Sequence, residues 1–273
     1  MSVIAISRGS LRAATKLAEG LSSKLQSAVI SREQVLEAAE RYGIGETGLE
    51  LRHIMAQHPP GFWENYADAR KHYLACFKAA LFDFVLEGPC IYHGNLAHIL
   101  LNDVSFVLRV RVNAPMENRL EAMMAELGVS RHDAVRRIEA IDKERKRWTE
   151  FLYDVDVMNP VHFDVVMNLS RMTVQDGVEM VAAAVEKEQF RRTEESLKAV
   201  RDVRLATVAE TLLMRHPDTY GLDLGVTANA AKGSVAVTGR FPAGDAKVIE
   251  SQIRTALSGF QEIQHVAARI EIG

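Results

Sequence analysis

Apolar positions along the chain follow two spacings, one typical of buried strands and the other of amphipathic helices. Residues 3–7 form a short apolar run, and after it Leu17, Leu21 and Leu25 recur at helical spacing. Further extended runs lie at residues 90–92, 105–114 and 163–169, and a helical stretch follows each of the last two. Because strands and helices alternate with short connections, the pattern predicts a parallel sheet covered by helices on both faces.

A different order of elements follows the polar stretch at residues 189–195, which lacks periodicity. Extended and helical runs then come in the order helix, hairpin, helix and strand, at residues 197–214, 222–238, 246–257 and 264–272. Lys232-Gly233 is the predicted turn of the hairpin. This order predicts helices packed on one antiparallel sheet. We therefore expect an α/β domain over residues 1–190 and a small α+β domain over residues 195–273.

The composition places the chain among ordinary globular proteins. Its 273 residues exceed the usual size of a single core, and 48% are apolar and 25% charged. The net charge of −3 gives no electrostatic reason to expect binding to nucleic acid. Cys76 and Cys90 are too few for a disulfide framework. Because the sequence shows neither a signal peptide nor an apolar run of about 18 residues, it predicts a cytoplasmic protein.

The turn after the first predicted strand is where a phosphate-binding loop would lie. Such a loop reads G-x-x-x-x-G-K-[ST], because glycines let backbone N–H groups face the phosphates and the lysine adds charge. From Gly9 this chain places Ala14 where the second glycine stands and Thr15 where the lysine stands. Lys16 comes one residue late, which rotates it by roughly 100° around a helix. Taken alone, these residues favour an ordinary turn between a strand and a helix.

The helix that begins near Ser130 carries a basic residue on its inward side. The apolar residues of that side are Val135, Ile138, Ile141, Trp148 and Leu152. Arg145 lies on the same stripe, and Arg137 lies two turns earlier on nearly the same face. Two interpretations of Arg145 stay open, because it could pair with Asp142 or bind a phosphate.

Other candidate chemistry is weaker. His93 and His98 are five residues apart, so they share no helix face, and no carboxylates stand nearby in a metal-site pattern. No metal site is therefore predicted. Ser7, Ser10 and Ser105 stand in no nucleophile-elbow pattern, which argues against a hydrolase.

Several segments together resemble the cytidylate-kinase-like family. They read IAISRGS, ISREQVLEAAERYGI, PPGFWENYADARKHYLACFKAAL, IYHGNLAHILL, VLRVRVNAPMENRL and DKERKRWTEFLYDVD, and they span most of residues 1–190 in order. The resemblance implies a P-loop nucleoside-monophosphate-kinase fold that uses ATP and Mg²⁺. It also implies an acceptor similar to CMP or dCMP, and a lid that carries arginines.

The resemblance also implies roles for individual residues. Residues 9–16 correspond to the phosphate loop, Arg32 to a residue near the acceptor, and Lys16 and Arg145 to catalytic groups. The implied nucleotide-binding residues are Arg8, Gly9, Ser10, Arg12, Thr15, Arg32, Arg137, Asp142 and Arg147. Since the glycine-rich loop is reduced to Gly9, a Cβ at Ala13 or Ala14 would hinder close approach of backbone to phosphate.

The altered loop keeps two further hypotheses open. In the first, the domain is a catalytically impaired nucleotide sensor that relays its bound state to a partner. In the second, it is a scaffold and the C-terminal part carries the function. Residues 196–272 resemble a BON domain, mainly through GSVAVTGRFPAGDAKVIESQIRTALSGFQEIQHV. This second resemblance implies a module that binds a protein or a lipid surface.

Overall fold

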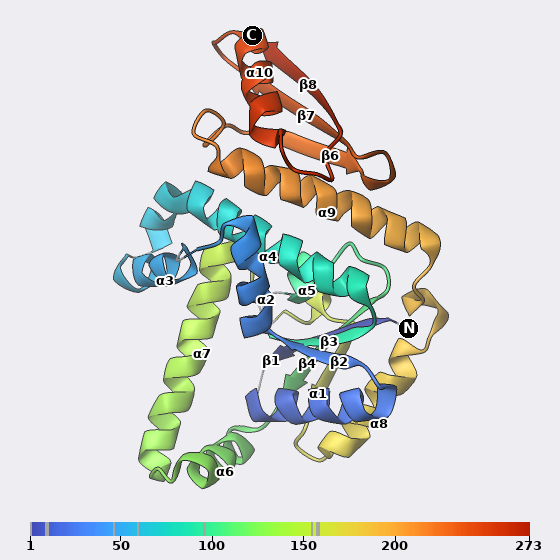
Figure 1. The fold of residues 1–273 in the computed structure, drawn as a ribbon. Coiled ribbons are helices and arrows are strands. Elements are labelled where there is room, and N and C mark those ends of the chain that lie inside the picture. The colour runs from blue at the N-terminus through green and yellow to red at the C-terminus, as the bar shows by residue number, and fades with distance from the viewer. Residues whose placement is uncertain are drawn as a thin grey trace. The chain divides into compact units, whose positions relative to one another are not determined.

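The structure, a computed structural model, divides into two compact units (Figure 1). It describes residues 2–8, 11–45, 47–58, 60–94, 97–153, 155–156 and 159–273. The first unit comprises residues 1–34 and 88–192, and the second comprises residues 35–87 and 193–273. No helix within the described ranges combines the length and the apolar character needed to cross a membrane.

A five-stranded parallel sheet forms the centre of the first unit. Its order across the sheet is β2 (Ala28–Ser31), β3 (Cys90–His93), β1 (Val3–Arg8), β4 (Val107–Asn113) and β5 (Val165–Asn168). Every neighbouring pair is parallel, with Ile4 of β1 opposite Ile91 on one side and Leu108 on the other. This arrangement confirms the α/β class that the alternation of strands and helices predicts.

Helices connect these strands. The helices of the first unit are α1 (Leu11–Leu25), α5 (Ala97–Leu100), α6 (Met116–Leu127), α7 (Arg131–Tyr153) and α8 (Val174–Val185), with short 3-10 helices η3 (Pro160–His162) and η4 (Glu188–Phe190). A further helix, α2 (Arg32–Ala39), begins in the first unit and ends in the second. A serine followed three residues later by a glutamine is the sequence signal of a capping box, and Ser31 and Gln34 form one at the start of α2. Ser31 Oγ accepts from Gln34 N–H, and Gln34 Oε1 accepts from Ser31 N–H.

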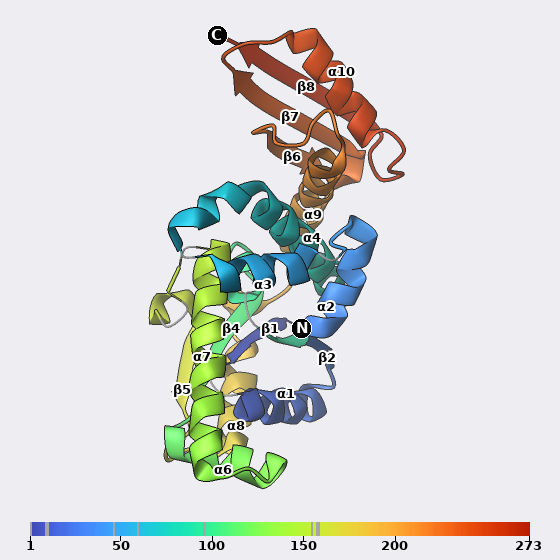
Figure 2. The ribbon, with the colours of Figure 1, turned by 90° about the vertical axis from the view of Figure 1, so that its left-hand side faces the viewer.

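The core of the first unit lies between the sheet and the pair α1 and α8, which pack side by side (Figures 1 and 2). Leu17 and Leu21 of α1 and Val181 of α8 are completely or almost completely buried there. Gly20 permits this close packing, because a Cβ at Gly20 would lie 2.6 Å from Cγ2 of Val178.

The second unit combines two segments that are far apart in the sequence. Its elements are η1 (Glu40–Tyr42), α3 (Thr47–Gln57), η2 (Pro60–Tyr66), α4 (Ala67–Glu87), α9 (Glu194–Arg215), β6 (Gly225–Asn229), η5 (Ala230–Lys232), β7 (Ser234–Phe241), α10 (Ala246–Leu257) and β8 (His265–Ile272). The hairpin of β6 and β7 turns at Gly233, whose φ of 57° suits glycine.

The small sheet is mixed, which corrects the antiparallel sheet expected from the sequence. β6 and β7 are antiparallel, but β8 lies parallel to β7 at the opposite edge from β6. The physical reason is that α10 separates β7 from β8, and a helical crossover returns the chain in the same direction.

Helix α9 is buried along two faces. Leu205, Ala209 and Leu213 belong to the core of the small sheet. The helix also packs along α4, as Figure 1 shows. The chain passes from the first unit to the second at Arg192–Thr193, close to the boundary expected at residues 190–195. However, residues 35–87, which the sequence analysis assigns to the N-terminal domain, pack with the C-terminal part through this helix.

Candidate functional site

Three parallel strands of the first unit end at one edge of its sheet. β1, β4 and β5 are neighbours and run in the same direction, so the residues that follow them come together there. In open parallel sheets this edge is where ligands bind. These residues line a cleft of about 430 Å³, and its lining is Arg12, Ala13, Lys16, Ala114, Asn118, Glu121, Ala122, Leu169, Met172 and Val174.

Helix α1 supplies the positive charge of the cleft. Arg12 and Lys16 are four residues apart, so they lie on the same face of the helix and both line the cleft. Arg12 Nη1 donates a hydrogen bond to the carbonyl oxygen of Ala122 at 3.1 Å. Ala13 also lines the cleft, whereas Ala14 is completely buried in the core. The late position of Lys16 therefore still brings its side chain to the cleft.

The rest of the cleft wall comes from α6 and from the segment between β5 and α8. Asn118 Nδ2 donates to the carbonyl oxygen of Leu169 at 3.5 Å, which connects these two parts. Leu169, Met172 and Val174 give this wall an apolar surface, and Glu121 is the one carboxylate among the described residues that line it. An apolar wall next to two cations suits a ligand with a flat ring and an anionic group.

The residues expected in the lid all lie on α7, and none of them lines this cleft. Arg137 is exposed, while Arg145 and Arg147 are half-buried. Asp142 accepts two hydrogen bonds from Arg119 of α6, at 2.7 and 2.8 Å. This bidentate pair joins α6 to α7, and the spacing of residues along α7 gave no sign of it.

A second group that the sequence analysis missed lies against β4. His98 is 2% exposed and its ring stacks on Phe163 with centroids 4.6 Å apart. Burial, with further contributions from His162, Arg111 and Arg109, lowers the pKa of His98 to about 3. Arg111 is also buried and its Nε donates to Asn113 Oδ1 at 3.1 Å. Arg111 and Asn113 lie close together in the sequence, whereas His98 belongs to another element. Residue spacing therefore gives no sign that the buried neutral imidazole of His98 belongs to the same group as the buried guanidinium of Arg111.

The remaining predicted residues fall into two sets. Arg32 is the first residue of α2, directly after the carboxyl end of β2, and Thr15 is half-buried on α1. Gly9, Ser10 and the side chain of Arg8 lie outside the described residues. In the described part of the chain, no group of three His, Cys, Asp or Glu side chains could hold a metal ion.

Comparisons with known proteins agree on the family of the N-terminal part of the chain. A profile described as the cytidylate kinase-like family matches residues 3–171. A cytidylate kinase of Methanopyrus kandleri is 31% identical over 108 residues, which amount to 38% of this chain and 55% of that protein. The chain thus spans about half the length of this curated relative.

A solved structure extends the likeness to the fold. The crystal structure of an uncharacterized protein from Eubacterium ventriosum matches with a TM-score of 0.50 and 17% sequence identity. The match covers 68% of this chain and 98% of that one. At this level of identity it shows a shared fold alone.

Proposed function

Since that profile spans well over half of its residues, the chain belongs to the cytidylate kinase-like family, and we propose that it transfers a phosphoryl group from ATP to a nucleoside monophosphate similar to CMP or dCMP. In this proposal the donor nucleotide occupies the cleft beside α1, and the acceptor binds near Arg32. Arg12 and Lys16 bind phosphate oxygens, and Arg145 reaches the reacting phosphates when a ligand is present.

The cleft is the observation that carries this proposal. Its volume of about 430 Å³ lies within the range of sites for small ligands. The apolar side chains of Leu169, Met172 and Val174 suit a nucleobase, and the two cations of α1 suit the phosphates. The cleft also lies where ligands bind in sheets of this kind.

The chemistry follows from charge. Phosphoryl transfer needs little covalent chemistry from the protein, so catalysis consists mainly of positioning the phosphates and neutralising their charge. The cleft offers two cations and one carboxylate, which fits a nucleotide that brings Mg²⁺ on its own phosphate oxygens. When bound, the ion would offset part of the phosphate charge. Arg137, Asp142 and Arg147 would then belong to a lid that excludes water.

A specific observation favours the alternative of a nucleotide sensor that binds without turnover. Ala14, at the position of the second loop glycine, is completely buried in the core, so its backbone is part of the packed helix α1 rather than of an open loop. The cleft can therefore hold a nucleotide through side chains without backbone contacts from the position of the second loop glycine.

A transfer assay separates the two possibilities. Purified full-length protein is mixed with Mg²⁺ and ATP, and CMP phosphorylation is followed. The kinase proposal predicts turnover that falls by at least about 100-fold in Arg145→Ala, because arginines that offset charge in the transition state carry effects of about 10³-fold or more. Lys146→Ala, an exposed neighbour on the same helix, is the matched control and should keep full activity.

Each outcome of the assay has one meaning. Unchanged turnover in Arg145→Ala would remove Arg145 from the mechanism. Nucleotide binding with no turnover in the unaltered protein would refute the kinase proposal and support the sensor.

A further inference from the structure

Helix α7 is packed at its two ends but not in its middle. Near its start, Ile138 is buried against Leu120 of α6, which lies beside α7 (Figures 1 and 2). Near its end, Trp148 is 3% exposed. Between these two contacts, the stretch 139–147 contains no buried residue. Arg145, which the proposed function places at the reacting phosphates, belongs to this stretch, so its position depends on polar contacts.

An ion pair between α6 and α7 holds this middle stretch. Arg119 of α6 donates two hydrogen bonds to Asp142, from Nη1 to Oδ2 at 2.8 Å and from Nη2 to Oδ1 at 2.7 Å. Two parallel bonds between planar groups fix their relative orientation as well as their distance. The side chain of Arg119 is 17% exposed and that of Asp142 is 41% exposed, so water screens the pair only in part.

A second guanidinium lies near the same carboxylate. Arg111 of β4 is buried, and burial lowers its pKa, while the carboxylates of Asp156 and Asp142 oppose this shift. Asp142 is therefore within electrostatic reach of β4, one of the strands whose carboxyl ends meet at the ligand-binding edge of the sheet. The pair of Asp142 with Arg119 thus holds the middle of α7 near that edge.

Helix α6 is itself fixed at the cleft beside α1. Ala122, one turn after Arg119, lines the cleft, and its carbonyl oxygen accepts from Arg12 of α1 at 3.1 Å. Asn118, the residue before Arg119, also lines the cleft. Hydrogen bonds therefore connect α1 to α6 and α6 to α7, from the cations of the cleft to the helix that carries Arg145.

We propose that Arg119 is a positioning residue, whose bidentate pair with Asp142 fixes the rotation of α7 about its axis and so directs Arg145 toward the phosphates. This inference rests on the proposed function. Arg145 follows Asp142 by three residues, so both lie on one face of α7 and a rotation displaces them together. Asp142 then acts through Arg119 rather than by contact with the nucleotide. Misplacement of a reacting group by about 1 Å can cost about 100-fold in rate.

The first measurement compares turnover with ATP affinity in Arg119→Met, on the full chain. The turnover number for CMP phosphorylation should fall by about 10- to 100-fold, because Arg145 is no longer held in position. The dissociation constant of ATP should stay unchanged, since Arg119 does not line the cleft. Arg119→Lys keeps the charge but loses the planar fork, so it should recover part of the lost turnover and guards against misfolding of Arg119→Met.

Arg131→Met is the matched control. Arg131 of α7 also pairs with a carboxylate of α6, because its Nη2 donates to Glu117 Oε2 at 2.7 Å. Both side chains are more than half exposed, and Arg131 is the first residue of α7, far along the helix from Arg145. The control therefore removes an ion pair between the same two helices at another place, and it should keep the turnover number of the parent.

Hydrogen exchange of α7, measured by mass spectrometry, tests the inference without any turnover. In Arg119→Met the backbone amides of residues 139–147 should exchange at least about 10-fold faster than in the parent, because hydrogen bonds between charged groups are lost. In Arg131→Met the exchange of this stretch should equal that of the parent.

The outcomes distinguish the two proposals. If the unaltered protein shows no turnover, the kinase proposal fails, and the exchange of residues 139–147 alone decides whether Arg119 holds α7 in place. Equal exchange in Arg119→Met and the parent would overturn the positioning role. Faster exchange with an unchanged turnover number would overturn it as well, and so would an equal fall of turnover in Arg131→Met.

Discussion

Replacing His98 by phenylalanine should remove much of the acid sensitivity of the first unit. The imidazole is 2% exposed, and neither of its ring nitrogens has a hydrogen-bond partner among the residues that the structure describes. The charged groups that lower its pKa, His162, Arg111 and Arg109, are all bases. Protonation would therefore place an unsolvated cation next to other cations.

The magnitude follows from the pKa of His98, which falls from 6.5 to about 3 on folding. Because the folded pKa of this base is depressed, its neutral form stabilises the fold above pH 6.5, and that stability is lost as the pH falls toward 3. At about 1.36 kcal/mol per pKa unit, the largest possible loss is about 5 kcal/mol. Between pH 7 and pH 5 the loss should be about 2 kcal/mol.

Urea unfolding at pH 7 and pH 5 measures this loss. The chain has two tryptophans, Trp63 in the second unit and Trp148 in the first, so a Trp63→Phe background reports on the first unit through Trp148 fluorescence. In that background, the free energy of unfolding of the His98→Phe variant should fall by about 2 kcal/mol less between pH 7 and pH 5 than that of the protein that keeps His98. The ring of phenylalanine can keep the stack on Phe163.

Two controls make the result decisive. His132→Phe makes the same substitution at an exposed histidine of the same unit and controls for the change of residue type. His98→Leu repeats the test with a side chain of another shape. If both His98 variants lose as much stability between pH 7 and pH 5 as the parent does, the account of a buried neutral imidazole is wrong.

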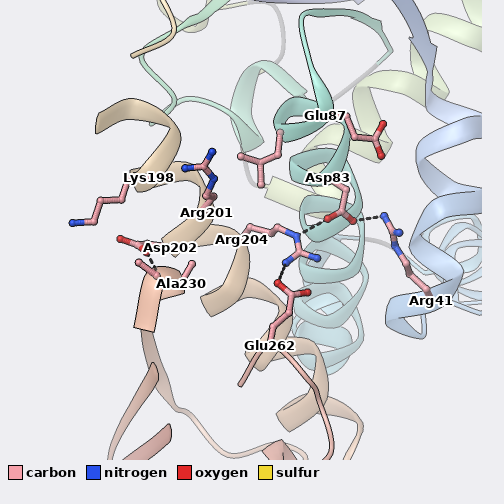
Figure 3. Close-up of a pocket in the computed structure, with 11 residues that line it drawn as sticks. Arg41, Asp83, Glu87, Lys198, Arg201, Asp202, Arg204, Ala230 and Glu262 are labelled. Atoms are coloured by element: carbon pink, nitrogen blue, oxygen red, sulfur yellow. Dashed lines mark hydrogen bonds and ion pairs between the residues drawn. The ribbon is translucent and has the colours of Figure 1, made fainter. Parts of the chain in front are cut away.

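Three further changes test the packing of the two units by thermal and urea unfolding. Arg204→Met should destabilise the second unit by about 1–3 kcal/mol, because Asp83, whose side chain is 10% exposed, loses one of its two guanidinium partners and keeps Arg41 (Figure 3), whereas Arg254→Met should change stability by less than about 1 kcal/mol. Burial raises the pKa of Glu210, so the folded state loses stability as the pH rises through that pKa. Glu210→Gln should therefore stabilise the second unit at pH 7, and this gain in stability should vanish in acid. Gly20→Ala should cost about 1–3 kcal/mol, and Val178→Ala in addition should recover part of it.

Local signals in the sequence predicted local structure well. The capping box of Ser31 and Gln34 and the turn at Gly233 depend on residues close together in the chain, and both occur in the structure. The parallel pairing of β7 with β8 and the packing of α4 on α9 could not be read in this way. Both depend on contacts between distant segments, which a hydrophobic pattern does not encode.

The same distinction applies to the candidate site. Arg12 and Lys16 are four residues apart and share a helix face, but the sequence was interpreted only through the late position of Lys16, which favoured an ordinary turn. The ion pair of Arg119 with Asp142 joins residues that are 23 positions apart in the sequence. The stack of His98 on Phe163 joins residues that are 65 positions apart. Residue spacing gives no signal for such pairs, because the fold brings them together.

The resemblance of residues 196–272 to a BON domain stays a prediction, as does a protein or lipid partner for that part. Because α9 packs on α4 as well as on the small sheet, a fragment that starts at Glu195 would expose a helix face that is buried in the full chain. Partner binding should therefore be measured on the whole protein.

Titration of the full-length protein with ATP, by calorimetry and without Mg²⁺, is the most direct test for a nucleotide site beside α1. We expect saturable binding that weakens by at least about tenfold in Lys16→Ala, since a charge-assisted contact to phosphate is lost. Lys24→Ala, an exposed lysine later on the same helix and outside the cleft, should bind as the parent does. Absence of ATP binding, or binding that is the same in Lys16→Ala as in the parent, would contradict a nucleotide site in the cleft beside α1.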